Sequence, residues 1–325
     1  MDRLITLDEI RRAREALPAS VRRTPILPFS ADSSQVERER LFLKAENLQV
    51  TGAYKIRAAF TILASLSPEA RGRGVVLTSS GNFAQAFGFA GASMGAPIVV
   101  VMLDRTSPYK VAATRGYGAE VVFCGEDALA RQPAVEEIAK ERGMTPIDTW
   151  EEPMATAGHG SIGLEIAEDF PEAETVLVPV SSGGVAAGVS TAIKETLPNV
   201  KVIGVQPERA NAAYVSLRKG EPTAIDYWDT MADGLSAVRP GAFPFRHLQK
   251  YLDEIVLITE NDIANAFRSL LYRAKILGEP AGVVAAAAFL SGKVDTSRKT
   301  VAAVTGGNVT SEVVQKMLEM SAPAE

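Results

Sequence analysis

The sequence predicts an α/β fold in which two domains each contain a largely parallel β-sheet flanked by helices. Three observations support this prediction: the chain has 325 residues, 46% of them are hydrophobic, and short apolar runs alternate with helix-length segments. A chain of this length exceeds the size at which one core usually stops growing, so two domains are expected. Alternating strands and helices are typical of parallel sheets that are covered on both faces.

Seven short runs have the continuous apolar and β-branched character of strands that are buried on both faces. They are residues 74–78, 97–102, 119–123, 175–180, 201–205, 254–258 and 300–304. Segments long enough for a helix separate them. A further helix is expected near the N-terminus, at residues 7–16.

The domain crossing is expected near residues 150–160, where Pro153, Gly158 and Gly160 interrupt the pattern. The N-terminal segment should pack onto the later half of the chain. We therefore predict a discontinuous large domain, residues 1–66 and 150–325, with a small domain inserted at residues 67–149.

Composition restricts the classes of function. A formal net charge of −5 argues against nucleic-acid binding, and no apolar run is long enough for a membrane span or a signal peptide. The lone Cys124 cannot form an internal disulfide, which favours the cytoplasm. We expect a cytoplasmic protein with a small-molecule substrate. Because little sequence follows Met320, we expect no C-terminal regulatory domain.

The first candidate motif is Thr51-Gly-Ala-Tyr-Lys-Ile-Arg57, which places a lysine after a glycine turn. A lysine that forms a Schiff base needs its pKa lowered, and packing among Tyr54 and Ile56 could remove it from water. The alternative for Lys55 is a solvated surface side chain.

The second motif, Thr78-Ser-Ser-Gly-Asn-Phe-Ala-Gln-Ala86, joins a predicted strand to a predicted helix. Such a turn presents free backbone N–H groups and the positive end of the helix dipole, which suit a carboxylate or a phosphate. The alternative is that Ser80 only caps the helix.

Two further turns are rich in glycine. Val180-Ser-Ser-Gly-Gly-Val-Ala-Ala-Gly188 would allow the backbone to approach a phosphate closely, and it does not match a nucleotide P-loop. Val304-Thr-Gly-Gly-Asn308 places a hydroxyl after a buried strand. Taken alone, each motif is equally compatible with a plain turn.

In this order and spacing, the four motifs resemble the fold type II pyridoxal-phosphate family, in its threonine dehydratase and serine racemase branch. The resemblance implies a tryptophan synthase β-like fold and pyridoxal 5'-phosphate as cofactor. It implies that Lys55 binds the cofactor covalently, that Asn82 contacts its phenolic oxygen, and that Thr305 faces its pyridine nitrogen. Glu279, in a Gly-Glu-Pro-Ala-Gly run, would lie nearby. The phosphate loop would consist of Ser181, Ser182, Gly183, Gly184 and Val185.

The sequence departs from the family pattern at several positions. Phe83 replaces the usual histidine, His159 replaces a glutamine, and Thr305 replaces the commoner serine. Ser181 and Ser182 replace two glycines of the phosphate loop. These changes concern the substrate side and leave the cofactor-binding pattern intact.

The resemblance implies an ammonia-lyase, or dehydratase, that converts a small β-hydroxy amino acid into an oxo acid and ammonia. Threonine, serine and 3-hydroxyaspartate are the candidate substrates. Lys55 would also take the α-proton, and Arg131 could pair with a second carboxylate unless it is a solvated helix residue. The expected binding site for the α-carboxylate comprises Ser79, Ser80, Gly81, Asn82 and Phe83.

Two alternative functions remain open at this point. An amino acid racemase would use Ser80 on the face opposite Lys55, and a non-catalytic protein would bind the cofactor without turnover. A homodimer is the family expectation. No metal is expected, because Gln206 and Ala212 stand where metal-dependent relatives have carboxylates. Gln206 could instead hydrogen-bond the backbone of that loop.

Overall fold

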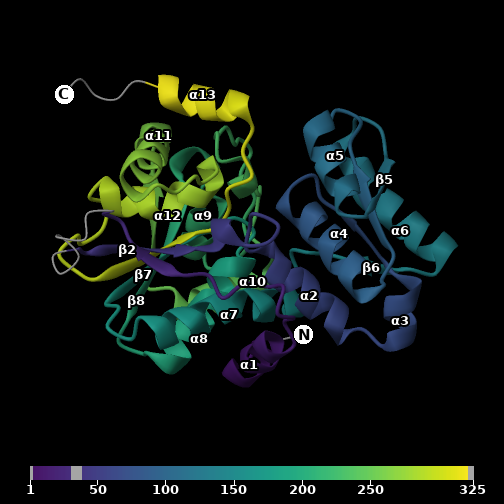
Figure 1. Ribbon diagram of the computed structural model, residues 1–325, viewed down its shortest axis with the longest axis horizontal. Coiled ribbons are helices and arrows are strands. Elements are labelled where there is room, and N and C mark those ends of the chain that lie inside the picture. The colour runs from purple at the N-terminus through teal and green to yellow at the C-terminus, as the bar shows by residue number, and fades with distance from the viewer. Residues whose placement is uncertain (1–2, 31–38, 321–325) are drawn as a thin grey trace.

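A computed structural model of the protein describes residues 3–30 and 39–320. It contains two β-sheets with helices on their faces (Figure 1). In order across the sheet, the larger one has β1 (Ile26–Pro28), β2 (Leu41–Ala45), β10 (Thr300–Val304), β7 (Thr175–Pro179), β8 (Lys201–Pro207) and β9 (Glu254–Ile258). The smaller one has β5 (Glu120–Phe123), β4 (Ile98–Met102), β3 (Val75–Thr78) and β6 (Thr145–Ile147).

Every strand pairing among the described residues is parallel except that of β1 with β2. The predicted α/β class with parallel-rich sheets is therefore confirmed. Thirteen α-helices accompany the strands in this part of the chain. They are α1 (Leu7–Glu15), α2 (Lys55–Ser65), α3 (Pro68–Arg73), α4 (Asn82–Met94), α5 (Pro108–Gly116), α6 (Arg131–Arg142), α7 (Pro153–Asp169), α8 (Gly184–Thr196), α9 (Ala212–Lys219), α10 (Ala242–Tyr251), α11 (Glu260–Ser269), α12 (Pro280–Leu290) and α13 (Ser311–Glu319).

Helices cover both faces of each sheet. Along β7, Leu177 packs into the core with α11 and α12, whereas Val176 and Val178 pack into the core with α7 and α8 on the other face (Figure 1). In β3, Leu77 shares a core with α2 and α4, and Val76 faces α6. Strands buried on both faces need apolar residues at every position. All seven predicted strands are confirmed, although β5 and β9 lie at sheet edges and are only partly buried, and the predicted N-terminal helix α1 is confirmed as well.

Strands β1, β2 and β6 were not predicted from the sequence. All five residues of β2 are buried, but Lys44 interrupts its apolar run. This lysine is fully buried because its ammonium group donates to Glu165 of α7 and to the carbonyl of Thr24. Both β1 and β6 are three-residue edge strands that contain a proline, which is typical of edges.

A buried ion cluster joins the start of α2 to the larger sheet. The Arg57 guanidinium lies 2.8 Å from Oε1 of Glu46 and 2.7 Å from Oε1 of Glu165, and all three side chains are buried. With Lys44, the cluster contains two cations and two anions. Burial acts to raise the pKa of Glu46, but the adjacent charge of Arg57 and its hydrogen bonds prevail and lower it. The cluster anchors the first turn of α2, which begins at Lys55.

Helix α2 packs against α4 beside the smaller sheet and against α7 beside the larger one. The division into a large domain (1–66 and 150–325) and an inserted domain (67–149) remains a prediction. Within the described ranges, no helix is both long enough and apolar enough to cross a membrane.

We predict that Arg57→Ala lowers the free energy of unfolding by about 3–5 kcal/mol, because it removes the ion pair of the buried Glu46 and leaves the buried Glu165 with Lys44 alone. Urea denaturation of the purified protein measures this. The matched control is Arg105→Ala, which removes an exposed ion pair with Glu126 and should cost less than about 1 kcal/mol. Equal losses in the two variants would contradict a special role for the buried cluster.

Candidate active site

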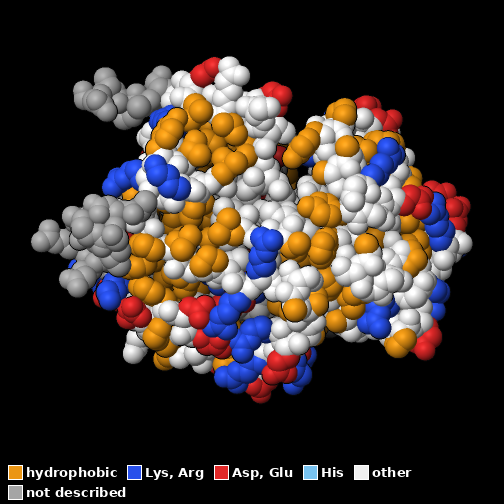
Figure 2. Space-filling view, viewed as in Figure 1, with side chains coloured by type: hydrophobic (Ala, Val, Ile, Leu, Met, Phe, Trp, Pro, Cys, Tyr) orange, Lys and Arg blue, Asp and Glu red, His pale blue; other side chains and the backbone are white. Residues whose placement is uncertain are grey.

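Two adjoining cavities of about 560 Å³ each lie between the two sheets. Figure 2 shows a notch in the molecular surface between the parts that carry α13 and α5 in Figure 1. Strands β3, β7 and β10 end at these cavities, since Thr78, Pro179 and Thr305 line them. Ligands of parallel α/β sheets bind outside the carboxyl ends of the strands. This cleft is therefore the candidate active site.

Lys55 lines both cavities. Its ammonium nitrogen lies 4.6 Å from the ring centre of Tyr54 and 4.4 Å from that of Phe83. Among the described residues no hydrogen-bond acceptor contacts it. Burial lowers the pKa of Lys55 to about 7, although the nearby charge of Glu279 acts in the opposite direction. The aromatic rings supply the desolvation that a nucleophilic lysine needs, and a large fraction of Lys55 is neutral at pH 7.

The turn before α4 lines the first cavity with Ser79, Ser80 and Gly81. Gly81 is the N-cap residue and no side chain caps the helix, so Ser80 does not serve as a cap. The Ser80 side chain is exposed to the cavity. The Ser79 hydroxyl accepts a 3.4 Å hydrogen bond from the backbone N–H of Gly81. The exposed Ser80 hydroxyl together with the N-terminal N–H groups of the helix favours an anion, which suits a carboxylate.

The glycine-rich loop before α8 lines the second cavity with residues 181–185. Gly183 has a φ of +107°, a left-handed conformation that favours glycine, and it is the N-cap residue of α8. His159 lies beside Gly184, and burial lowers its pKa well below the ordinary value, so that it stays neutral. The loop can hold a phosphate at the positive end of the α8 dipole.

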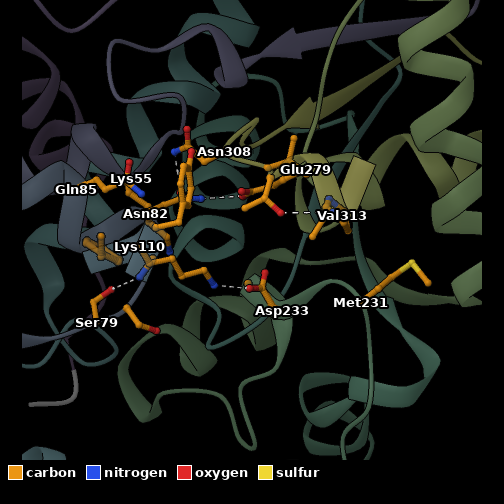
Figure 3. Close-up of a pocket in the computed structure, with 18 of the residues that line it drawn as sticks. Lys55, Ser79, Asn82, Gln85, Lys110, Met231, Asp233, Glu279, Asn308 and Val313 are labelled. Carbon is orange, nitrogen blue, oxygen red and sulfur yellow. Dashed lines mark hydrogen bonds and ion pairs between the residues drawn. The ribbon is translucent and has the colours of Figure 1, made fainter. Parts of the chain in front are cut away.

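Thr305 and Glu279 complete the second cavity. Only 4% of Thr305 is exposed, and its hydroxyl has no hydrogen-bond partner in the described part of the chain. Such a hydroxyl can pair with a ring nitrogen of a ligand. Glu279 accepts a 2.8 Å hydrogen bond from Nδ2 of Asn82, and burial raises the pKa of its carboxyl to about 7 (Figure 3).

Every residue proposed from the sequence for catalysis or binding lines one or both cavities. Arg131, which begins α6, and Phe83 line both. The buried lysine, the glycine loop and the unpaired Thr305 hydroxyl together fit pyridoxal phosphate, whose aldehyde, phosphate and pyridine nitrogen require these three partners.

The sequence analysis did not anticipate three further residues of the cleft. Lys110 of α5 donates to Asp233 at 2.8 Å, an ion pair that joins the two sides of the first cavity (Figure 3). No local motif marked either residue. Asn308 also lines the first cavity, and its only sequence signal was its position after Gly306-Gly307.

Gln206 hydrogen-bonds its own loop, as the sequence analysis anticipated. Its Nε2 lies 3.3 Å from the carbonyl oxygen of Val180 and 3.2 Å from that of Ala210, and its Oε1 accepts from the backbone of Tyr214 at 2.8 Å. All polar atoms of this buried amide are thus occupied. Among the described residues no group of three or more His, Cys, Asp or Glu could hold a metal ion.

A parallel α/β fold with a partly buried lysine of lowered pKa and two helix N-termini at one cleft is the arrangement expected of an enzyme that binds an aldehyde cofactor. The chain belongs to the family of pyridoxal-phosphate dependent enzymes, whose sequence model matches residues 17–306. It is 40% identical over 311 residues to an L-threonine ammonia-lyase of Geobacter sulfurreducens, covering 95% of this chain and 77% of that protein.

Solved structures show the same fold. A threonine deaminase from T.th. superimposes with a TM-score of 0.87 at 33% identity, over 94% of this chain and 99% of that one. Maize serine racemase superimposes with a TM-score of 0.90 at 27% identity, over 97% of each chain. The predicted family, fold type and cofactor are thereby confirmed.

The lowered pKa of Lys55 predicts the pH dependence of cofactor attachment. Only the neutral amine is nucleophilic, so the rate at which the cofactor-free protein binds pyridoxal phosphate covalently should rise up to about pH 7 and then level off. An ordinary lysine, with a pKa of 10.5, would continue to gain rate far above pH 8. Stopped-flow absorbance measures the rate, and N-acetyl-lysine amide corrects for ionisation of the cofactor itself. A profile parallel to that of the free amine would refute the assignment.

The occupied amide of Gln206 predicts that activity needs no divalent cation. A neutral amide cannot replace the carboxylates that offset the dehydration of magnesium or calcium. Activity should therefore be unchanged after treatment with EDTA and gain less than about twofold from added magnesium. A several-fold loss that magnesium or calcium restores would show this interpretation of the loop to be wrong.

Proposed function

We propose that the protein is an ammonia-lyase, or dehydratase, that acts on small β-hydroxy amino acids. Threonine, serine and 3-hydroxyaspartate are the proposed substrates, and the products are an oxo acid and ammonia. One observation carries the proposal: Lys55, with a pKa near 7, lies in a cleft that also contains an anion-binding turn before α4 and an anion-binding loop before α8. Similarity to an L-threonine ammonia-lyase and to a threonine deaminase supports it.

The side chains divide the work between cofactor and substrate. Residues 181–185 bind the phosphate, and Ser79 and Ser80 bind the α-carboxylate of the amino acid. When bound, pyridoxal phosphate supplies an electron-withdrawing ring that stabilises negative charge at the α-carbon. Lys55 holds the cofactor and, once its amine is free, takes the α-proton.

Thr305 limits how much charge the ring can accept. A threonine hydroxyl can donate a hydrogen bond to the pyridine nitrogen. Because the hydroxyl carries no negative charge, it does not stabilise the protonated form of that nitrogen. A neutral ring withdraws electrons less strongly than a protonated one. This favours prompt loss of the β-hydroxyl over accumulation of a carbanion, which is the course of a dehydratase.

Arg131 is the proposed partner for a second substrate carboxylate. It lines both cavities from the first residue of α6, and its planar guanidinium can bind a carboxylate through two hydrogen bonds. This role would extend the substrate range from threonine and serine to 3-hydroxyaspartate.

An amino acid racemase is the second candidate function. Ser80 does not cap α4 and its hydroxyl is exposed to the first cavity, so it is available to return a proton to the α-carbon. The similarity to maize serine racemase supports this alternative.

We also propose a cytoplasmic homodimer. The lone Cys124 supports the compartment, and the family resemblance supports the dimer.

Substrate assays test the proposed function directly. The purified holoenzyme should release ammonia and oxo acid from at least one of threonine, serine and 3-hydroxyaspartate. Lys55→Ala should lower turnover by at least about a hundredfold and abolish covalent cofactor binding. Lys140→Ala, an exposed lysine of α6, is the matched control and should retain full activity.

Chiral chromatography of the same reactions separates the alternatives. Inverted amino acid without oxo acid would replace the dehydratase with the racemase. Cofactor absorbance without turnover of any substrate would indicate a cofactor-binding protein.

A further inference from the structure

Asn308 connects the loop that precedes Lys55 to the helix that begins with Asn82. Its Nδ2 lies 2.8 Å from the carbonyl oxygen of Thr51 and 2.8 Å from Oδ1 of Asn82. Figure 3 shows Asn82 between Asn308 and Glu279, and Lys55 and Asn82 line the same two cavities. Nδ2 of Asn82 then donates to Oε1 of Glu279 at 2.8 Å. Thr51, Asn308, Asn82 and Glu279 therefore form one hydrogen-bonded chain.

The carbonyl group at the Thr51 end determines the direction of every hydrogen bond in this chain. The carbonyl of Thr51 can only accept, so Asn308 must present its NH₂ group there. The same NH₂ group contacts Asn82, which must therefore present its carbonyl oxygen to Asn308. The NH₂ group of Asn82 consequently faces Glu279 and the second cavity.

Two glycines leave room for this chain. A Cβ atom at Gly52, whose φ is +72°, would lie 2.3 Å from Oδ1 of Asn308. A Cβ atom at Gly306 would lie 2.4 Å from Oε1 of Glu279 and 3.3 Å from Nδ2 of Asn82. The backbone also joins the two loops, because the N–H of Gly307 donates to the carbonyl of Gly52 at 2.9 Å. The hydrogen-bonded side chains thus pack directly against the backbone of Gly52 and Gly306, where any residue larger than glycine would collide with them.

We infer that Asn308 is a positioning residue that orients the amide of Asn82 so that one of its N–H groups faces the cofactor. Asn82 has two N–H groups, of which one donates to Glu279. Among the described residues no acceptor takes the second, which leaves it for an acceptor oxygen on the cofactor ring. Without Asn308, the Asn82 amide can turn over and present its carbonyl oxygen, which repels that acceptor.

The inference rests on the proposed contact between Asn82 and the cofactor, and a double-mutant cycle on cofactor affinity tests it. The dissociation constant of pyridoxal phosphate is measured by absorbance titration of the cofactor-free protein for wild type, Asn82→Ala, Asn308→Ala and the double variant. Asn308→Asp is a second variant at this position, in which the side chain keeps its shape but cannot donate a hydrogen bond. Asn47→Ala is the matched control, since this nearby amide also donates to a backbone carbonyl, that of Leu277, and has no hydrogen bond to Asn82.

We expect Asn82→Ala, Asn308→Ala and Asn308→Asp each to weaken cofactor binding about three- to tenfold, the effect of one hydrogen bond. The double variant should bind as weakly as Asn82→Ala alone, because Asn308 acts through Asn82. The pH profile of the bound cofactor's visible absorbance should shift in the same direction in all of these variants and stay unchanged in Asn47→Ala.

Multiplicative losses in the double variant would overturn the inference, because Asn308 would then act on the loop rather than on Asn82. Unchanged affinity in Asn308→Asp would overturn it as well. Unchanged affinity in Asn82→Ala would remove the contact on which it rests. The wild-type substrate assays need none of these variants, so failure of the proposed function is recognised separately.

Discussion

The site depends on one contrast between two lysines that are both taken out of water. Lys44 is fully buried but donates to Glu165 within a cluster that also holds Arg57 and Glu46, so its charge is balanced. Lys55 lies against Tyr54 and Phe83 with no acceptor among the described residues, and its pKa falls to about 7. The first arrangement anchors helix α2, and the second lowers the pKa of the residue that begins this helix, as the proposed nucleophile requires.

The parallel sheets bring the remaining groups to this lysine. The N-termini of α4 and α8, which follow β3 and β7, line the same cleft, so two positive helix ends are available for two anions. An amino acid bound to pyridoxal phosphate carries two such anions, a carboxylate and a phosphate. In the proposed function the turn after β3 in the smaller sheet binds the substrate carboxylate, the loop after β7 in the larger sheet binds the cofactor phosphate, and Lys55 lines both cavities.

Residues that depart from the family pattern affect the candidate active site in different ways. Phe83 contributes an apolar ring beside the Lys55 amine and thereby helps to shield it from water. Thr305 keeps an uncharged hydroxyl at the second cavity, as the proposed elimination reaction requires. Ser80 leaves α4 uncapped and keeps its hydroxyl exposed, which is the observation behind the proposed racemase alternative.

The sequence by itself determined the fold class, seven strands and the location of the four motifs. Burial on both faces makes such strands continuously apolar, and strand-to-helix turns carry their glycines and hydroxyls locally. Only the tertiary structure decided that Lys44 lies inside a strand, that Lys110 pairs with Asp233, and that Asn308 contacts Asn82. The partners of these side chains are far away in the sequence. Which polar group a side chain contacts is therefore decided only when the chain has folded. The pKa of Lys55 was likewise undecided, because it depends on which rings and charges surround the amine.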